Sequence, residues 1–303
     1  MSILNCGSLF QKSDRDNPKC RVEGNLNKSE NVGDISTVSV ESTEEVSAEL
    51  KSVKTSVSTS ESSKESTKPS EPRTLVKVCK MGSEHMRKNV NNHDFVFSFL
   101  NLKAVTDGCG SGKHSEVGTR LFGQLFAREI KQHVSDEKIS EDAFLKTVNT
   151  VFEKMLSLCN DTNFIFENYC FTILVCLEFE SEFVVYSCGD GYIIKENSDG
   201  ISFERLDDGT FPAYYVYNWV DASALEEYKE GVVFKVSRFS KTEYSNVGVA
   251  SDGLRFFDDL YEPEKTKFFD LLVKGKGGKI DMLINRNNNK RSGLFHDDIS
   301  ICF

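Results

Sequence analysis

Features that mark membrane and secreted proteins are absent from this sequence of 303 residues. The longest apolar run, from Tyr169 to Leu177, is about half as long as a membrane-spanning helix requires. The N-terminal residues lack the apolar core of a signal peptide, and the sequence contains no lipidation motif. We therefore expect no membrane among the partners of this protein.

The cysteine pattern and the charge balance exclude two further classes, zinc-site proteins and general nucleic-acid binders. The nine cysteines form no CxxC pair and no zinc-like spacing. Free thiols are typical of a reducing compartment, so the sequence predicts a cytoplasmic protein. The formal net charge is -10. Because nucleic acids attract proteins through clustered Lys and Arg, we expect no nucleic-acid partner.

Aromatic residues are nearly missing from the first part of the chain, where Phe10 is the only one before Phe95. From about Ser29 to Pro72 the sequence is mostly Ser, Thr, Glu and Lys. Such a composition buries too little apolar surface to offset the loss of chain entropy on folding. We predict a disordered tail over 1–72, acting as a solvated linker or as a binding element, and a folded domain over 73–303.

Short β-type runs and a few amphipathic helices make up the remainder. Strands are predicted at 94–100, 102–106, 169–177, 183–188, 192–195, 214–220, 232–236, 247–251 and 299–303. Helices are predicted from the N-cap Ser115, with Val117 to Ile130 supplying the apolar face, from about Ser140, and over about 258–273. The regular β-α alternation of a parallel sheet is missing. We predict an α+β fold, a sandwich of two antiparallel sheets with helices outside.

Four aspartates follow predicted strands at turn positions. Asp107, Asp190 and Asp252 each precede a glycine, and Asp297 precedes another aspartate. A single Asp-Gly pair is a common turn and carries little information. Hard divalent cations, however, bind several carboxylate oxygens from different chain segments, and the ends of neighbouring strands can bring such groups together. As a set, the four aspartates therefore predict a cation site.

These aspartates belong to a longer series of short motifs. In chain order the series contains Asn92-His93-Asp94 and the segments 105–112, 187–191, 250–254 and 297–300. The series resembles the type-2C protein phosphatase family, from about Gly82 to Phe303. The resemblance is greatest to the branch with an upstream Gly-x-x-His motif, here Gly82 to His85, and with Asp-Gly-x-Gly-Ser in the segment that begins at Asp107.

The resemblance implies an α-β-β-α sandwich with two Mg²⁺ or Mn²⁺ ions at one end of the sheets. It implies that Asp107 bridges the two ions and that the backbone carbonyl of Gly108 binds one of them. Asp252 and Asp297 would hold the other ion. The implied activity is hydrolysis of phosphoserine or phosphothreonine in a protein substrate.

Two further aspartates receive secondary roles from the same resemblance. Asp94 would act through metal-bound water, and Asp190 would lie beside the site or help to hold a third, weaker metal. Two divalent ions about 3.5–4 Å apart activate water near neutral pH and neutralise the phosphoryl oxygens during in-line attack. A covalent enzyme intermediate is then unnecessary, which agrees with the absence of a Cys-x5-Arg phosphatase loop from the sequence.

The group that would protonate the leaving oxygen is left open by the sequence. The best-known members of the family carry a histidine directly after Asp-Gly, and this position is Cys109 here. A thiol is a poor acid for this task. His85 and His114 are the alternatives, because a histidine in a polar loop can donate a proton near neutral pH.

The phosphate-binding residue is also open, and the sequence raises two other functions. The family's usual arginine position is Asn89 here, so Arg87 or Lys88 would take its role. A nucleotide-binding P-loop is disfavoured, because the glycine-rich segment 108–113 has the wrong spacing and no Ser or Thr after its lysine. A catalytically inactive, phosphatase-like scaffold is the main alternative. Retention of every matched aspartate favours the enzyme, since buried like charges are costly without a cation.

Overall fold

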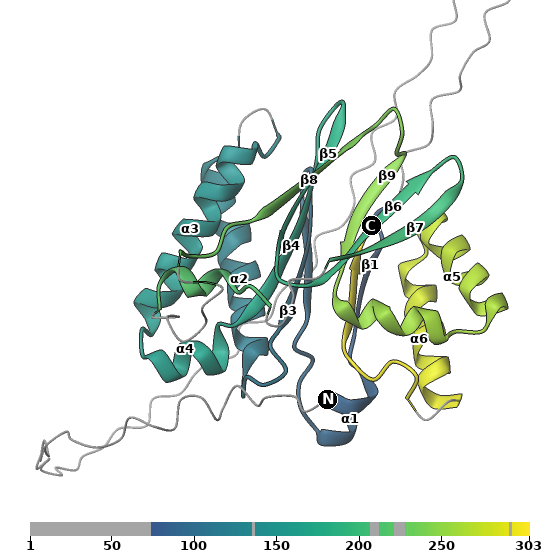
Figure 1. Ribbon diagram of the computed structural model, residues 1–303, viewed down its shortest axis with the longest axis horizontal. Coiled ribbons are helices and arrows are strands. Elements are labelled where there is room, and N and C mark those ends of the chain that lie inside the picture. The colour runs from purple at the N-terminus through teal and green to yellow at the C-terminus, as the bar shows by residue number, and fades with distance from the viewer. Residues whose placement is uncertain (1–73, 135–136, 207–211, 221–227, 229, 291–292) are drawn as a thin grey trace, which may run out of the picture. The chain divides into compact units, whose positions relative to one another are not determined.

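The computed structural model describes residues 74–134, 137–206, 212–220, 228, 230–290 and 293–303. The predicted tail over 1–72 lies outside the described residues. The described strands form two five-stranded antiparallel sheets that pack face to face, with helices on both outer sides (Figure 1). The predicted α+β sandwich is confirmed. Among the described helices, none is long and apolar enough to cross a membrane.

Each sheet combines strands that are far apart in the sequence. The first sheet has the order β1 (Lys77–Lys80), β10 (Ile299–Cys302), β9 (Asn246–Ala250), β6 (Gly191–Asn197) and β7 (Gly200–Leu206). The second has the order β2 (Phe95–Phe99), β3 (Leu102–Gly108), β4 (Phe171–Glu178), β5 (Glu182–Cys188) and β8 (Lys235–Ser240). The last strand of the chain therefore lies inside the first sheet, between β1 and β9.

The helices divide between the two outer faces (Figure 1). The second sheet is covered by α2 (Ser115–Glu129), α3 (Glu141–Leu158) and α4 (Thr162–Asn168). The first sheet is covered by α5 (Glu262–Val273) and α6 (Gly277–Lys290). The short α1 (Ser83–Lys88) and the 3-10 segments η2 (Ile130–Gln132), η3 (Tyr215–Asn218) and η5 (Asp252–Asp259) complete the described elements.

Three apolar layers hold the sandwich together: one between the sheets and one under each set of helices. Strand β4 contributes to two of them. Ile173 and Val175 face the helices, whereas Leu174 and Cys176 face the other sheet. Because successive side chains of a strand point to opposite faces, a strand buried on both sides must be apolar throughout. Burial of each such aliphatic side chain stabilises the fold by about 1.5–3 kcal/mol.

The ends of the two long helices test the predicted caps. The start at Ser140 is confirmed, because its hydroxyl accepts a hydrogen bond of 3.1 Å from the amide of Ala143. The cap at Ser115 was wrong: Ser115 is the first helical residue, and its hydroxyl donates to the carbonyl of Cys109 at 3.0 Å. Val117 was also misplaced and is 43% exposed, because α2 turns Gly118 and Phe122 toward the core instead.

Several other elements differ from the prediction. Residues 214–220 contain the 3-10 segment η3 in place of a strand, because their aromatic rings pack onto α3: Trp219 stacks on Phe152 with ring centroids 5.2 Å apart. Helix α6 was missed, since its glycines and asparagines weaken the helical pattern. Ile280, Leu283 and Ile284 nevertheless recur at helical spacing and are buried. The short β7, α1 and α4 were missed as well, and β8 begins three residues later than predicted.

Candidate active site

A cavity of about 190 Å³ brings together most of the residues that the sequence predicted for the site. It is lined by His85, His93, Asp107, Gly108, Cys109, Gly110, Thr172, Asp190, Pro212, Tyr214, Asp252 and Asp297. These residues come from both sheets and from the loops that join them. Asp94 is buried behind this lining, where its negative charge acts on Asp107.

The ends of strands position the four predicted aspartates. Asp107 is the penultimate residue of β3, and Asp190 occupies the turn between β5 and β6. Asp252 is the first residue of η5 and lies two residues after the end of β9. Asp297 lies two residues before β10. The backbone segments that carry these last two residues approach closely because residue 253 is glycine: a Cβ there would lie 1.9 Å from the carbonyl oxygen of Asp298. A larger residue would therefore push the backbone at residue 253 away from Asp298.

The carboxylates of this cluster are held in an environment that disfavours their negative charge. Burial and the charges of Asp94 and Asp252 raise the pKa of Asp107 well above its ordinary value. Burial, followed by the charge of Asp298, raises the pKa of Asp94 to about 7. Burial also raises the pKa of Asp252 to about 6, although Arg255 opposes this shift. Crowded carboxylates of this kind are stabilised by a bound cation.

The donor set fits a hard divalent cation in its chemistry. The side chains supply carboxylate oxygens, and Oδ1 of Asp94 is buried without a hydrogen-bond donor among the described residues. The other oxygen of Asp94 accepts a 2.7 Å bond from the hydroxyl of Ser251. Within the described part of the chain, no three His, Cys, Asp or Glu side chains are grouped closely enough to hold a metal. The guanidinium of Arg255 pairs with the carboxylates of both Asp252 and Asp297.

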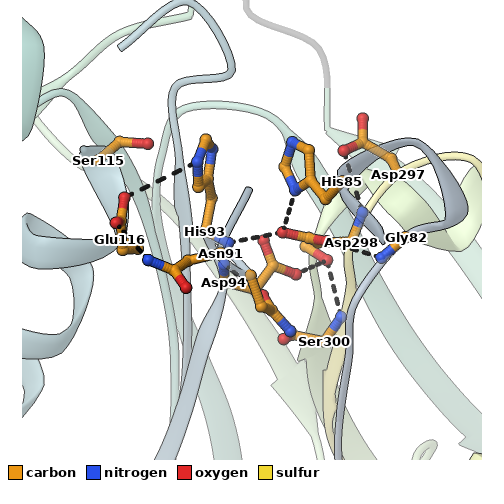
Figure 2. Close-up of polar contacts among 12 residues, drawn as sticks. Gly82, His85, Asn91, His93, Asp94, Ser115, Glu116, Asp297, Asp298 and Ser300 are labelled. Atoms are coloured by element: carbon orange, nitrogen blue, oxygen red, sulfur yellow. Dashed lines mark hydrogen bonds and ion pairs between the residues drawn. The ribbon is translucent and has the colours of Figure 1, made fainter. Parts of the chain in front are cut away.

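His85 is oriented by Asp298, a buried carboxylate with three donors around it (Figure 2). Asp298 accepts hydrogen bonds from the amide of Gly82 at 2.7 Å and from the amide of His93 at 2.6 Å, and it lies 2.8 Å from Nδ1 of His85. This last bond is the main cause that raises the pKa of His85. Because Nδ1 is engaged by Asp298, Nε2 is the ring nitrogen left to face the cavity.

His93 is a cavity residue that the sequence analysis did not single out. It is 3% exposed, and neither ring nitrogen has a hydrogen-bond partner among the described residues. Burial, followed by the charge of His85, lowers its pKa, so the ring is neutral near pH 7. The ring centroids of His85 and His93 are 4.4 Å apart, and the carboxylate of Glu116 lies 3.8 Å from Nε2 of His93 (Figure 2). The sequence signal that could have identified His93 is its position directly before Asp94, at the start of a predicted strand.

The remaining candidates lie away from the cavity lining that the described residues form. His114 has 63% of its side chain exposed, and its ring lies 3.7 Å from Glu116. Arg87 is exposed on α1, and Lys88 pairs with Glu84 one turn earlier. Cys109 does line the cavity, with its sulfur 3.0 Å from the hydroxyl of Ser111. Of the two histidines predicted as proton donors, the structure brings His85 to the carboxylates.

Comparison with known proteins identifies the family. A family model described as Protein phosphatase 2C matches residues 81–278, more than half of the chain. The chain belongs to the protein phosphatase 2C family. Membership of this family supports the interpretation that the chain is a phosphatase, which is a kind of hydrolase. It also agrees with the motif series of the sequence. No curated protein sequence matches the chain.

Solved structures share the fold of this phosphatase 2C chain at low sequence identity. A bacterial serine phosphatase carrying an arginine-to-alanine substitution is 17% identical, with a TM-score of 0.50, over 76% of this chain and 97% of that one. The catalytic domain of the serine/threonine phosphatase PstP, solved with two manganese ions, is 16% identical over 75% and 95% of the two chains, with a TM-score of 0.49. Stp1 from Staphylococcus aureus is 15% identical over 78% and 97%, with a TM-score of 0.47. At such identities, a TM-score of 0.50 shows a common fold.

The buried carboxylates predict that the metal-free phosphatase 2C domain is more stable at pH 5 than at pH 8. A carboxyl with a higher pKa in the folded state than in the unfolded state binds its proton more tightly when folded. Its contribution is lost as the pH rises from the unfolded value near 3.8 through the folded pKa, about 6 for Asp252 and about 7 for Asp94. The raised pKa of His85 acts in the same direction, whereas the lowered pKa of His93 opposes it. We expect a loss of about 2 kcal/mol or more between pH 5 and pH 8.

Urea unfolding in the presence of EDTA at the two pH values measures this difference. If the carboxylates bind Mn²⁺, its addition at pH 8 should restore the lost stability, since the cation would neutralise the same carboxylates. Equal stability at both pH values without metal would contradict the prediction.

Proposed function

We propose that this phosphatase 2C family member is an active, metal-dependent phosphomonoester hydrolase that acts on proteins phosphorylated on serine or threonine. One observation carries the proposal: Asp107, Asp190, Asp252 and Asp297 converge on a single cavity from separate strand ends, together with His85. If these aspartates served only to form turns, their carboxylates would not be expected to line the same cavity. The choice of serine or threonine as the phosphorylated residue follows the family resemblance of the sequence motifs.

We propose two Mg²⁺ or Mn²⁺ ions as the cofactors, with a third, weaker ion as an option. Asp107 would bind both ions, as the family resemblance implies, and the charges of Asp94, Asp252 and Asp297 all act on it. The carbonyl of Gly108 and the carboxylates of Asp252 and Asp297 would complete the set, with Asp94 and Asp190 at its edges. When bound, two such ions activate water and neutralise the phosphoryl oxygens.

The role of proton donor to the leaving oxygen is assigned to His85. A leaving serine or threonine oxygen is a strong base and needs a proton as its bond to phosphorus breaks. Asp298 holds the ring through Nδ1 and raises its pKa, which favours the protonated form of His85, while Nε2 faces the cavity. His93, which is buried and neutral, packs against this ring and limits its movement.

Hydrolysis of para-nitrophenyl phosphate by the purified full chain tests the proposed function. We expect hydrolysis with Mn²⁺ or Mg²⁺, loss of activity on addition of EDTA, and release of phosphate from phosphoserine or phosphothreonine peptides. Lack of hydrolysis with either metal would favour the scaffold. The cytoplasmic location and the phosphoprotein partner stay predictions, drawn from the cysteine pattern and from the family.

A further inference from the structure

Arg255 is bound to two carboxylates that the proposed function assigns to one metal ion. It lies in η5, three residues after Asp252. One terminal nitrogen of its guanidinium pairs with Oδ2 of Asp252, and the other donates to Oδ2 of Asp297 at 2.8 Å. The guanidinium also lies 4.9 Å from the ring centroid of Phe256, which supports it from another side. The side chain is therefore ordered by contacts with three different groups.

The two pairings join chain segments that are otherwise distant. Asp252 follows β9 and Asp297 precedes β10, and both line the cavity. Two carboxylates brought together in this way require a positive charge between them. A planar guanidinium can provide it with one nitrogen for each carboxylate, and a divalent cation can provide it by direct ligation. Because the guanidinium engages Oδ2 of both carboxylates and repels a second positive charge, it disfavours binding of a divalent cation to the same pair.

We propose that Arg255 is a built-in counter-cation that competes with the divalent metal ion for Asp252 and Asp297. The inference rests on the proposed function for the identity of the competing ion. In the metal-free protein Arg255 holds the two carboxylates in place, and binding of the metal requires the guanidinium to leave. The displaced side chain keeps its positive charge at the rim of the cavity, because it is anchored on the same short 3-10 segment as Asp252.

The competition should be weak enough for a metal ion to win. Arg255 has 44% of its side chain exposed, and the paired carboxylates are 23% and 40% exposed. Ion pairs with this access to water are only modestly stable. We therefore expect Arg255 to reduce the affinity for the metal by about tenfold, the effect of two such pairs, and not to abolish binding.

Calorimetric titration of the EDTA-stripped full chain with Mn²⁺ tests the competition. The variant Arg255→Gln removes the charge, and Arg255→Lys retains it. Arg286→Gln is the matched control, because Arg286 is a half-exposed arginine that forms an ion pair with Glu264 on the outer helices, away from the site. We expect the weaker Mn²⁺ event to tighten about tenfold in Arg255→Gln, to stay close to the parent in Arg255→Lys, and to be unchanged in Arg286→Gln.

The melting temperature provides a second readout that does not depend on activity. Without metal, Arg255→Gln should melt below the parent, because Asp252 and Asp297 then repel each other, and saturating Mn²⁺ should close the gap. Equal or weaker Mn²⁺ affinity in Arg255→Gln would overturn the inference. This result is distinct from failure of the proposed function: a parent that binds Mn²⁺ without hydrolysing para-nitrophenyl phosphate would refute the function, while tighter binding by Arg255→Gln would still support the competition.

Discussion

Asp107→Asn should abolish Mn²⁺-dependent hydrolysis while leaving the metal-free fold as stable as the parent or more stable. Asp107 lies among other carboxylates, and burial together with their charges raises its pKa well above the ordinary value. A carboxylate between two dications supplies an oxygen to each and offsets their repulsion. An amide preserves the shape but loses that charge. In the absence of metal the same loss relieves crowding, so the free energy of unfolding should not fall.

Three measurements on the same protein preparation separate these effects. Phosphatase assays report the loss of hydrolysis, calorimetry reports weaker Mn²⁺ binding, and urea unfolding in EDTA reports the metal-free stability. Asp142→Asn is the control, because Asp142 is an exposed aspartate in the first turn of α3, outside the cavity lining. Undiminished activity of Asp107→Asn would rule out a mechanism that depends on two metals at this residue.

His85→Ala should lower kcat by at least tenfold, since a positioned proton donor contributes about 10²–10⁴-fold to a rate. The matched variant His114→Ala should retain the parent's activity, because His114 is mostly exposed and lies away from the cavity. Cys109→Ala should also cost little, although Cys109 occupies the family's usual histidine position. The pH profile provides the stricter test. The parent should lose activity on the basic side as His85 loses its proton, and this limb should be absent from His85→Ala.

The substrate's leaving group offers an independent check on the role of His85. Para-nitrophenolate leaves without help from an acid, whereas a serine oxygen does not. The loss in His85→Ala should therefore be much smaller with para-nitrophenyl phosphate than with a phosphoserine peptide. An equal loss with both substrates would indicate that His85 acts on the structure of the site and not on the leaving oxygen.

The sequence predicted those parts of the site that depend on local pattern. Strand-end aspartates such as Asp107 and Asp252 were found because a short apolar run followed by Asp-Gly is visible in a few residues. The role of Asp298 was not visible, since its partners Gly82 and His85 lie more than 200 residues away in the sequence. Arg255 was missed for the same reason, because its second carboxylate, Asp297, is 42 residues away.

Local sequence pattern likewise predicted only part of the fold. Amphipathic strands and helices such as α3 follow from their own periodicity. Segment 214–220 did not, because its alternating aromatic residues fit a strand equally well, and only the packing surface offered by α3 selects the 3-10 turn. Tertiary contacts decided this element against its local preference.

The position of β10 between β1 and β9 makes the site depend on contacts between distant parts of the domain. Asp298, directly before β10, anchors His85 and His93, which lie more than 200 residues earlier in the sequence. Pairings between such distant residues close long loops and slow folding. We therefore expect the two histidines to be fixed only in a late step of folding, after β10 has paired with both of its neighbours.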